Sequence, residues 1–186
     1  KNKELSIHGL DYIRCKNCNH RYLIERLSDN ALERFYETDT VLSATLLDKK
    51  TTQARINQIN KPKVEWGIEE YKRVFGKKPK KIVDIGAGAG HFVFAAKELE
   101  MECYGVEPNI PSVKFAKEMF DIDLIPEDFL EIPEVCKDAD IITFWAVLEH
   151  LPNFMDFMKV GNQILSKNGG GLFVMEVPRW HSLDTK

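Results

Sequence analysis

Short apolar runs and longer amphipathic stretches alternate along the second half of the chain. The runs are rich in β-branched residues and predict strands at 81–85, 103–106, 123–125, 141–145 and 172–177. The stretches between them have helical spacing and predict helices at about 91–100, 111–120 and 154–166. Regular alternation of strand and helix indicates βαβ units, and therefore a Rossmann-like, doubly wound α/β fold with a mostly parallel sheet.

The first 80 residues have a different pattern. Residues 1–27 are short and mixed, whereas 29–38 and about 52–76 have helical spacing, with a break expected near Pro62. The basic, turn-forming run at 76–81 predicts a domain boundary. We therefore expect three parts, which are a small segment over 1–28, a helical extension over 29–79 and the α/β domain over 80–186.

A glycine-rich turn follows the first strand of the α/β domain. Gly86, Gly88 and Gly90 let the backbone turn tightly and let a ligand approach closely. A dinucleotide-binding fingerprint requires its third glycine at position 91, which is His91. Asp84 precedes the turn, and its charge suits a cationic or amino-bearing ligand better than a pyrophosphate.

Carboxylates also follow the second and third strands. Glu107 lies 21 residues after Gly86, where an acid can accept hydrogen bonds from both hydroxyls of a ribose. Asp128, followed by Phe129, could hold the amine of a base that packs on the ring. Each acid also has a structural explanation, since Glu107 could be a solvated strand end and Asp128 a helix N-cap.

In order and spacing, these motifs resemble the class I S-adenosylmethionine-dependent methyltransferases over about residues 80–178. The resemblance is carried by 83–90, 105–108, 127–129, 145–151 and 170–178. It implies S-adenosylmethionine as the cofactor. The cofactor-binding residues that it implies are Asp84, Gly86, Ala87, Gly88, Glu107, Pro108, Asp128, Phe129, Trp145 and Ala146.

The end of the fourth strand is where acceptor and methyl group are expected to meet. Trp145 and Ala146 would line the cofactor, and Glu149 and His150 follow directly. His150 is the candidate catalytic base, with Glu149 beside it, because an imidazole accepts a proton near neutral pH. Alternatively, both side chains orient the following loop by hydrogen bonds.

A complete sheet of this family has seven strands, and five are visible here. Only residues 179–186 follow the last of them, so we expect the methyltransferase domain to be truncated at its C-terminal end.

Cys15 and Cys18 have the spacing of one zinc knuckle, with His20 two residues further on. This segment is similar to the second half of the zinc-binding module that precedes some sugar methyltransferases, which makes zinc a candidate metal. Structural zinc needs four ligands, so the alternative is two reduced thiols.

Composition adds three constraints. Residues 1–81 hold 18 Lys/Arg against 11 Asp/Glu, a balance of +7, and residues 82–186 hold 8 against 18, a balance of −10. The basic half would suit a phosphate-bearing acceptor. Four cysteines are too few for a disulfide framework, and no apolar run is long enough to cross a membrane, so we expect a cytoplasmic protein without membrane contact.

The expected function is methyl transfer to a small polar acceptor, and the favoured acceptor is a sugar or nucleotide-sugar. Alternatives are a methyltransferase acting on RNA or on a quinone-type metabolite, and a non-catalytic cofactor-binding module. Nucleic acid is the less favoured partner; an RNA enzyme would use the basic run Lys77–Lys81 to contact the backbone.

Overall fold

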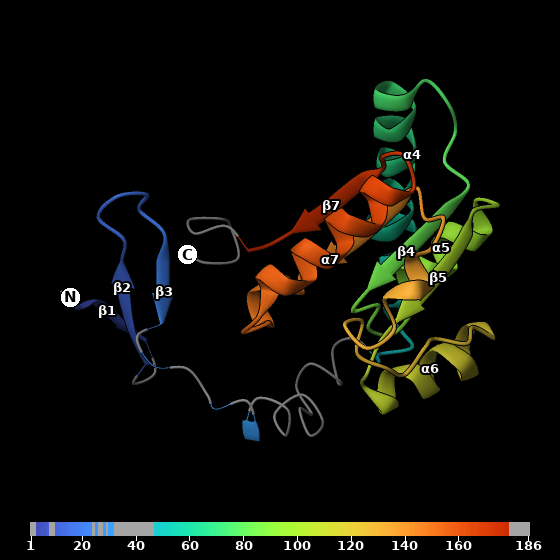
Figure 1. The fold of residues 1–186 in the computed structure, drawn as a ribbon. Helices are drawn as coiled ribbons and strands as arrows, with labels where there is room; N and C mark the ends of the chain where they lie inside the picture. The colour runs from blue at the N-terminus through green and yellow to red at the C-terminus, as the bar shows by residue number, and fades with distance from the viewer. Residues whose placement is uncertain are drawn as a thin grey trace. The chain divides into compact units, whose positions relative to one another are not determined.

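The computed structural model describes residues 3–7, 10–23, 25, 28, 30–31 and 47–178. The chain divides into two compact units, of which one is Lys1–Thr38 with Pro178–Lys186 and the other is Asp39–Val177. The larger unit contains the parallel sheet and is described first (Figure 1). Of the expected helix at 29–38, all but residues 30–31 lies outside the described residues.

Four parallel strands form the sheet of the larger unit, in the order β5-β4-β6-β7. They are β4 (Lys81–Ile85), β5 (Glu102–Val106), β6 (Ile141–Trp145) and β7 (Leu172–Glu176). The strand expected at 123–125 is reduced to one parallel bridge, between Ile125 and Val106. The N–H and the C=O of Ile125 each form one hydrogen bond with the backbone at the end of β5. A pairing of one residue is too short to make a strand.

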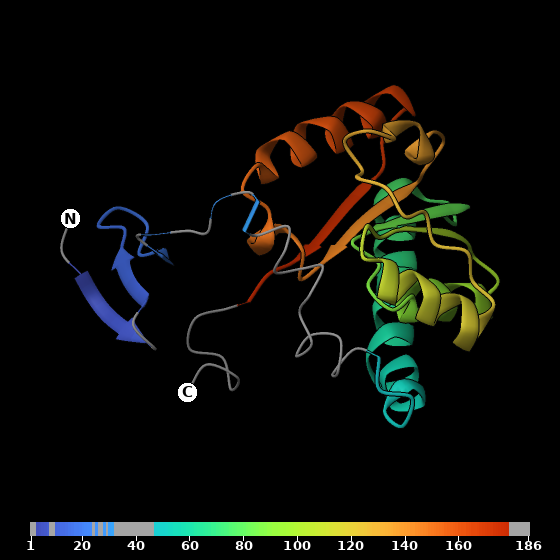
Figure 2. The ribbon, with the colours of Figure 1, turned by 90° about the horizontal axis from the view of Figure 1, so that it is seen from below.

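Helices cover both faces of this sheet, as the strand pattern predicts. α4 (Lys61–Phe75) and α5 (His91–Glu98) pack in one hydrophobic cluster with Ile82, and α7 (Phe154–Lys167) packs in a second cluster with Val83. Successive strand residues point to opposite faces, so neighbouring residues of β4 serve different clusters. Figure 2 shows α7 and α4 on opposite sides of the strands.

The remaining helices connect these layers. α6 (Ile110–Phe120) begins at Asn109, whose side-chain oxygen accepts a hydrogen bond from the N–H of Ser112 at 3.0 Å, as an N-cap does. Two short 3₁₀ helices, η2 (Pro133–Cys136) and η3 (Leu148–His150), lie before and after β6.

The helix expected over 52–76 is present and is irregular before its proline. α3 (Thr52–Arg55) runs into the π-helical segment η1 (Ile56–Asn60), and Pro62 lies in the first turn of α4. Val64, Ile68 and Tyr71 of α4 are buried against the sheet. The predicted boundary at 76–81 is therefore corrected, since it falls inside one compact unit that includes α4.

The amino-terminal unit contains a sheet that the sequence did not predict. β1 (Lys3–Ile7), β2 (Leu10–Arg14) and β3 (Arg21–Leu23) pair antiparallel in that order. Cys15 and Cys18 lie in the turn between β2 and β3, where the N–H of Cys15 donates to the carbonyl of His20 at 2.8 Å.

Within the ranges described, no helix has the length and apolar character needed to cross a membrane.

Candidate active site

Three glycines at the carboxyl end of β4 adopt left-handed backbone conformations. Gly86, Gly88 and Gly90 have φ values of 71°, 53° and 77°. A Cβ at Gly86 would lie 2.5 Å from Cγ2 of Val147, and one at Gly90 would lie 2.9 Å from Cβ of Ala116. The backbone conformation therefore favours glycine at all three positions, and the lack of space also favours it at Gly86 and Gly90.

Backbone hydrogen bonds hold this loop against the end of β5. The N–H groups of Gly86 and Ala87 donate to the carbonyl of Val106 at 2.8 and 3.0 Å. Ala87 is buried, and its Cβ would lie 2.8 Å from a Cβ at Gly105, so the loop and β5 are in close contact.

Asp84 lies in β4, just before the loop, and is 2% exposed. Its Oδ1 accepts a hydrogen bond from the Thr143 hydroxyl at 2.6 Å. Burial raises the pKa of Asp84 to about 7; the Thr143 hydrogen bond and the charge of Lys63 lower it, and the charge of Glu107 raises it. The carboxyl group therefore titrates near neutral pH.

Glu107 follows β5 and faces the loop. Its Oε2 accepts from the N–H of Gly88 at 2.7 Å, and its Oε1 accepts from the N–H of Asn109 at 2.8 Å. Burial raises the pKa of Glu107, and these two hydrogen bonds oppose the rise. The side chain is 9% exposed, so it is not a solvated strand end, whereas Pro108 beside it is exposed.

Asp128 and Phe129 do not form the pair that the sequence suggested. Asp128 is exposed, and its Oδ1 accepts from the N–H of Leu130 at 2.8 Å, as in a local turn. Phe129 is 1% exposed, with its ring 6.2 Å from that of Phe144 and 5.7 Å from that of Phe157. Because Phe129 is enclosed in the core, we correct its assignment to a packing residue.

The carboxyl end of β6 carries an unusual backbone conformation. Ala146 has a φ of 55°, and its N–H donates to the carbonyl of Glu176 at 2.9 Å. Non-glycine residues with a left-handed backbone conformation are found preferentially at functional sites. Trp145 packs on Phe92 at 5.5 Å, and its buried Nε1 has no hydrogen-bond partner among the described residues.

A hollow of about 370 Å³ opens beside Trp145 at the ends of β6 and β7. Lys63 of α4 reaches into this region, with its Nζ 2.9 Å from Oε1 of Glu176 and 4.3 Å from the centre of the Trp145 ring. The residues that line the hollow are Pro62, Lys63, Trp66, Trp145, Val174, Met175 and Glu176.

Glu149 and His150 lie in η3, directly after Val147. Both are exposed, with His150 Nε2 3.8 Å from Glu149 Oε1. The N–H of His150 donates to the carbonyl of Val147 at 2.9 Å, so the turn connects the histidine to the residue that faces Gly86.

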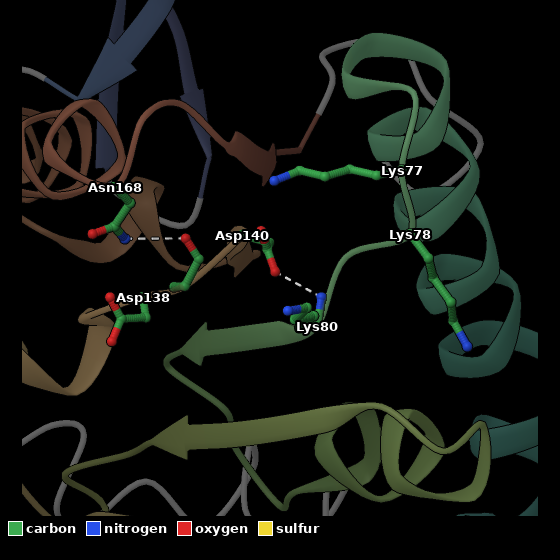
Figure 3. Close-up of a pocket in the computed structure, with 7 residues that line it drawn as sticks. Lys77, Lys78, Lys80, Asp138, Asp140 and Asn168 are labelled. Carbon is green, nitrogen blue, oxygen red and sulfur yellow. Dashed lines mark hydrogen bonds between the residues drawn. The ribbon is translucent and has the colours of Figure 1, made fainter.

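The basic run lies at the opposite edge of the sheet, before β4 begins. A hollow of about 240 Å³ has Lys77, Lys78, Lys80, Asp138 and Asp140 among its lining residues. Figure 3 shows these side chains. Parallel strands bring the glycine loop to one edge and this hollow to the other. The lysines proposed for backbone contacts in an RNA enzyme are therefore away from the loop.

Two zinc ligands at most come from the cysteine pair. Cys15 is half-buried and Cys18 exposed, and the ranges that the structure describes contain no group of three or more side chains suited to a metal. A hydrogen bond from the backbone of Cys18 lowers the pKa of the Cys15 thiol. Zinc at this pair stays a prediction.

Three residues of this region were missed from sequence. Thr143 is the one polar residue of the apolar run 141–145, which is a signal that could have been used. Glu176 belongs to the segment 170–178 that carries the family resemblance, but its pairing with Lys63 has no local signal, because 113 positions separate the two residues and only the packing of α4 on the sheet brings them together.

Comparison with known proteins defines the class of this chain. A family model described as a methyltransferase domain matches residues 64–185, which is more than half of the sequence, so the chain belongs to this family. A search of curated protein sequences found no match.

Solved structures agree with this assignment at the level of the fold. The plantazolicin methyltransferase BpumL in complex with SAH has a TM-score of 0.56 and 19% identity, over 72% of this chain and 52% of BpumL. The magnesium protoporphyrin IX methyltransferase ChlM from Synechocystis PCC 6803 with bound SAM has a TM-score of 0.51 and 15% identity, over 75% of this chain and 73% of ChlM. This chain thus spans about half the length of BpumL.

Proposed function

We propose that this protein transfers a methyl group from S-adenosylmethionine to a small polar acceptor. The observation that carries the proposal is the joint position of the glycine loop, Asp84 and Glu107 at one edge of a sheet in a methyltransferase-family chain. Ligands of open α/β sheets bind at the carboxyl ends of the strands. The BpumL and ChlM structures, which contain SAH and SAM, support the choice of cofactor.

The residues present fit this cofactor. The absence of side chains at Gly86 and Gly88 leaves backbone that a ligand can approach, and Asp84 can bind an ammonium group. Each Glu107 oxygen already accepts one backbone hydrogen bond, and a carboxylate has about four acceptor positions, so capacity remains for two ribose hydroxyls. Exposed Asp128 would accept from the adenine amine, without a contribution from Phe129.

S-adenosylmethionine supplies an electrophilic methyl group, so the protein's main contribution is to position the nucleophile. In this proposal Trp145 and Ala146 line the cofactor at the end of β6. His150 takes the proton of the acceptor, and Glu149 beside it orients the imidazole. Its exposure leaves His150 open to an acceptor arriving from solvent.

For the acceptor we propose a sugar ring, as a free sugar or a nucleotide-sugar. The support is the hollow beside Trp145, where the half-exposed ring of Trp66 offers a flat apolar face and the Lys63–Glu176 pair offers hydrogen bonds. Neither substrate named for BpumL or ChlM is a sugar, so this acceptor class rests on the chemistry of the hollow.

The test is transfer from S-adenosylmethionine with a radiolabelled methyl group to nucleotide-sugars, a catechol and RNA in parallel. We expect label in a nucleotide-sugar and, in His150→Ala, a loss of turnover of about 100-fold with little change in SAH affinity. Label in RNA or the catechol alone would contradict the sugar proposal. SAH binding without transfer to any acceptor would favour a non-catalytic module, and equal loss of turnover and SAH affinity would contradict the role of His150.

A further inference from the structure

Polar groups gather on one face of the sheet, at its carboxyl edge. Asp84 of β4 is the register partner of Thr143 on β6, and Trp145 of β6 is the register partner of Glu176 on β7. Thr143 and Trp145 are two residues apart, so their side chains share a face. α4 packs on this face, as the hydrophobic cluster of Val64 with Ile82 shows.

The two carboxylates of this face have unequal surroundings. The Glu176 side chain is 50% exposed and is paired with Lys63 at 2.9 Å. Asp84 is buried, and its hydrogen-bond partner is a neutral hydroxyl. A buried carboxylate without a full opposite charge is costly to ionise.

Among the residues that the structure describes, Lys63 is a cation whose charge acts on Asp84, and its position is fixed from two sides. Glu176 binds its ammonium group, and the face of Trp145 lies 4.3 Å below it. Its side chain is only 22% exposed, so its field is poorly screened by water.

We propose that Lys63 is a positioning residue that favours the ionised form of Asp84, so that Asp84 can bind the ammonium group of the cofactor. Glu176 and Trp145 hold the Lys63 ammonium where its charge reaches Asp84. This inference rests on the proposed function, because it assumes that Asp84 meets a cationic ligand.

Of the two charges that act on Asp84, Lys63 favours its ionised form and Glu107 opposes it. Burial raises the pKa of Asp84, and Glu107 at the end of β5 raises it further; Lys63 from α4 and Thr143 from β6 lower it. Cys103 of β5 also faces it; burial, then the charge of Asp84, raises the thiol pKa, so Cys103 is neutral there. Without Lys63, the carboxyl group would be protonated over more of the neutral range.

The experiment is calorimetric titration with SAH from pH 6 to pH 8.5 on the parent, Lys63→Gln and Lys61→Gln. Lys61 is a matched control, since it lies two residues away on α4 and is also ion-paired, with Glu98 at 3.0 Å. We expect Lys63→Gln to bind about fivefold more weakly at pH 7 and within about twofold of the parent at pH 8.5. Lys61→Gln should follow the parent throughout.

A structural role for Lys63 would give a loss that is the same at every pH, and that result would overturn the inference, as would no loss at all. If Lys63→Gln does not fold, Lys63→Arg retains the charge and should keep the parent's pH profile; an altered profile would contradict the proposal. Failure of the folded parent to bind SAH at any pH would instead contradict the proposed function.

Discussion

Asp84 and Asp140 lie at opposite edges of the same sheet and differ in how their charge is satisfied. Asp84, before the glycine loop, has one hydrogen bond from a neutral hydroxyl and a pKa raised by burial to about 7. Asp140, at the start of β6, accepts from the Tyr71 hydroxyl at 2.6 Å and from the N–H groups of Lys80 and Lys81 at 2.6 and 3.2 Å (Figure 3 shows the Lys80 contact). Burial raises the pKa of Asp140, but these hydrogen bonds outweigh it and the net pKa is lowered.

The difference separates a group that stabilises the fold from a group that is available to a ligand. At Asp140, three donors tie the end of α4, the turn after it and the start of β6 together. At Asp84, the fold provides burial without a matching charge, which lowers stability at neutral pH and leaves the carboxylate ready for a cation. Perturbed acids of this kind are found at functional sites more often than at structural ones.

Replacing Asp84 should give the largest effect on binding. For Asp84→Asn we expect a loss of SAH affinity of about 100-fold or more, because the amide cannot pair with an ammonium group. Its thermal unfolding midpoint at pH 8 should not fall below the parent's, since a buried charge has been removed. Calorimetry measures the SAH affinity, and thermal unfolding measures the stability. A destabilised variant that still binds SAH would show that Asp84 stabilises the fold and does not bind the ligand.

Replacing Asp140 should give the opposite result. Asp140→Ala removes three hydrogen bonds to a carboxylate and leaves the hydroxyl of buried Tyr71 without this acceptor. We expect the free energy of unfolding to fall by about 3 kcal/mol, while the SAH affinity of the folded protein stays within about twofold. Urea unfolding and calorimetry provide the two readouts, and a selective loss of binding would place Asp140 in the site.

Two glycines with the same backbone conformation extend the contrast. Gly86 has a φ of 71° and its Cβ would meet Val147, whereas Gly76, which ends α4, has a φ of 67° and nothing within 4 Å. We expect Gly76→Ala to cost about 1 kcal/mol and to leave SAH binding intact. Gly86→Ala should cost about 2 kcal/mol or more and abolish binding. Equal losses of stability and of SAH binding in the two variants would show that the close contact between Gly86 and Val147 contributes to neither.

The pH dependence of stability should have opposite signs for the two acids. The pKa of Asp84 lies above its ordinary 3.8, so its unfavourable contribution is absent below that value and develops as pH rises towards about 7, reaching at most roughly 4 kcal/mol. The pKa of Asp140 lies below 3.8, so its favourable contribution is complete above 3.8 and is lost as pH falls through the lowered value. The stability of Asp84→Asn relative to the parent should therefore increase from pH 4 to pH 8. Denaturant unfolding across this range measures it, and a flat difference would show that Asp84 is not protonated in the folded protein.

The sequence predicted the sheet better than it predicted the site. β4 and β6 were found with their observed bounds, because continuous apolar runs are typical of strands covered on both faces. The amino-terminal sheet was missed because its strands are short and mixed in polarity. The strand predicted at 123–125 is too long, since the local pattern does not reveal how many residues pair with the neighbouring strand.

In the site, the glycine loop and its acids were accessible because their spacing is local. Phe129 was misassigned because an apolar residue after an acid gives no information about which way its ring faces. Lys63 could not be found, since its position beside Trp145 depends on how α4 packs on the sheet.

The central claim is that the carboxyl edge of this sheet binds S-adenosylmethionine. Calorimetric titration with SAH on the parent and on Glu107→Ala tests it most directly, because Glu107 is the acid placed to hold the ribose. The account predicts binding in the micromolar range by the parent and its loss in the variant, with both proteins folded. A folded parent that does not bind, or a variant that binds as well as the parent, would contradict the account.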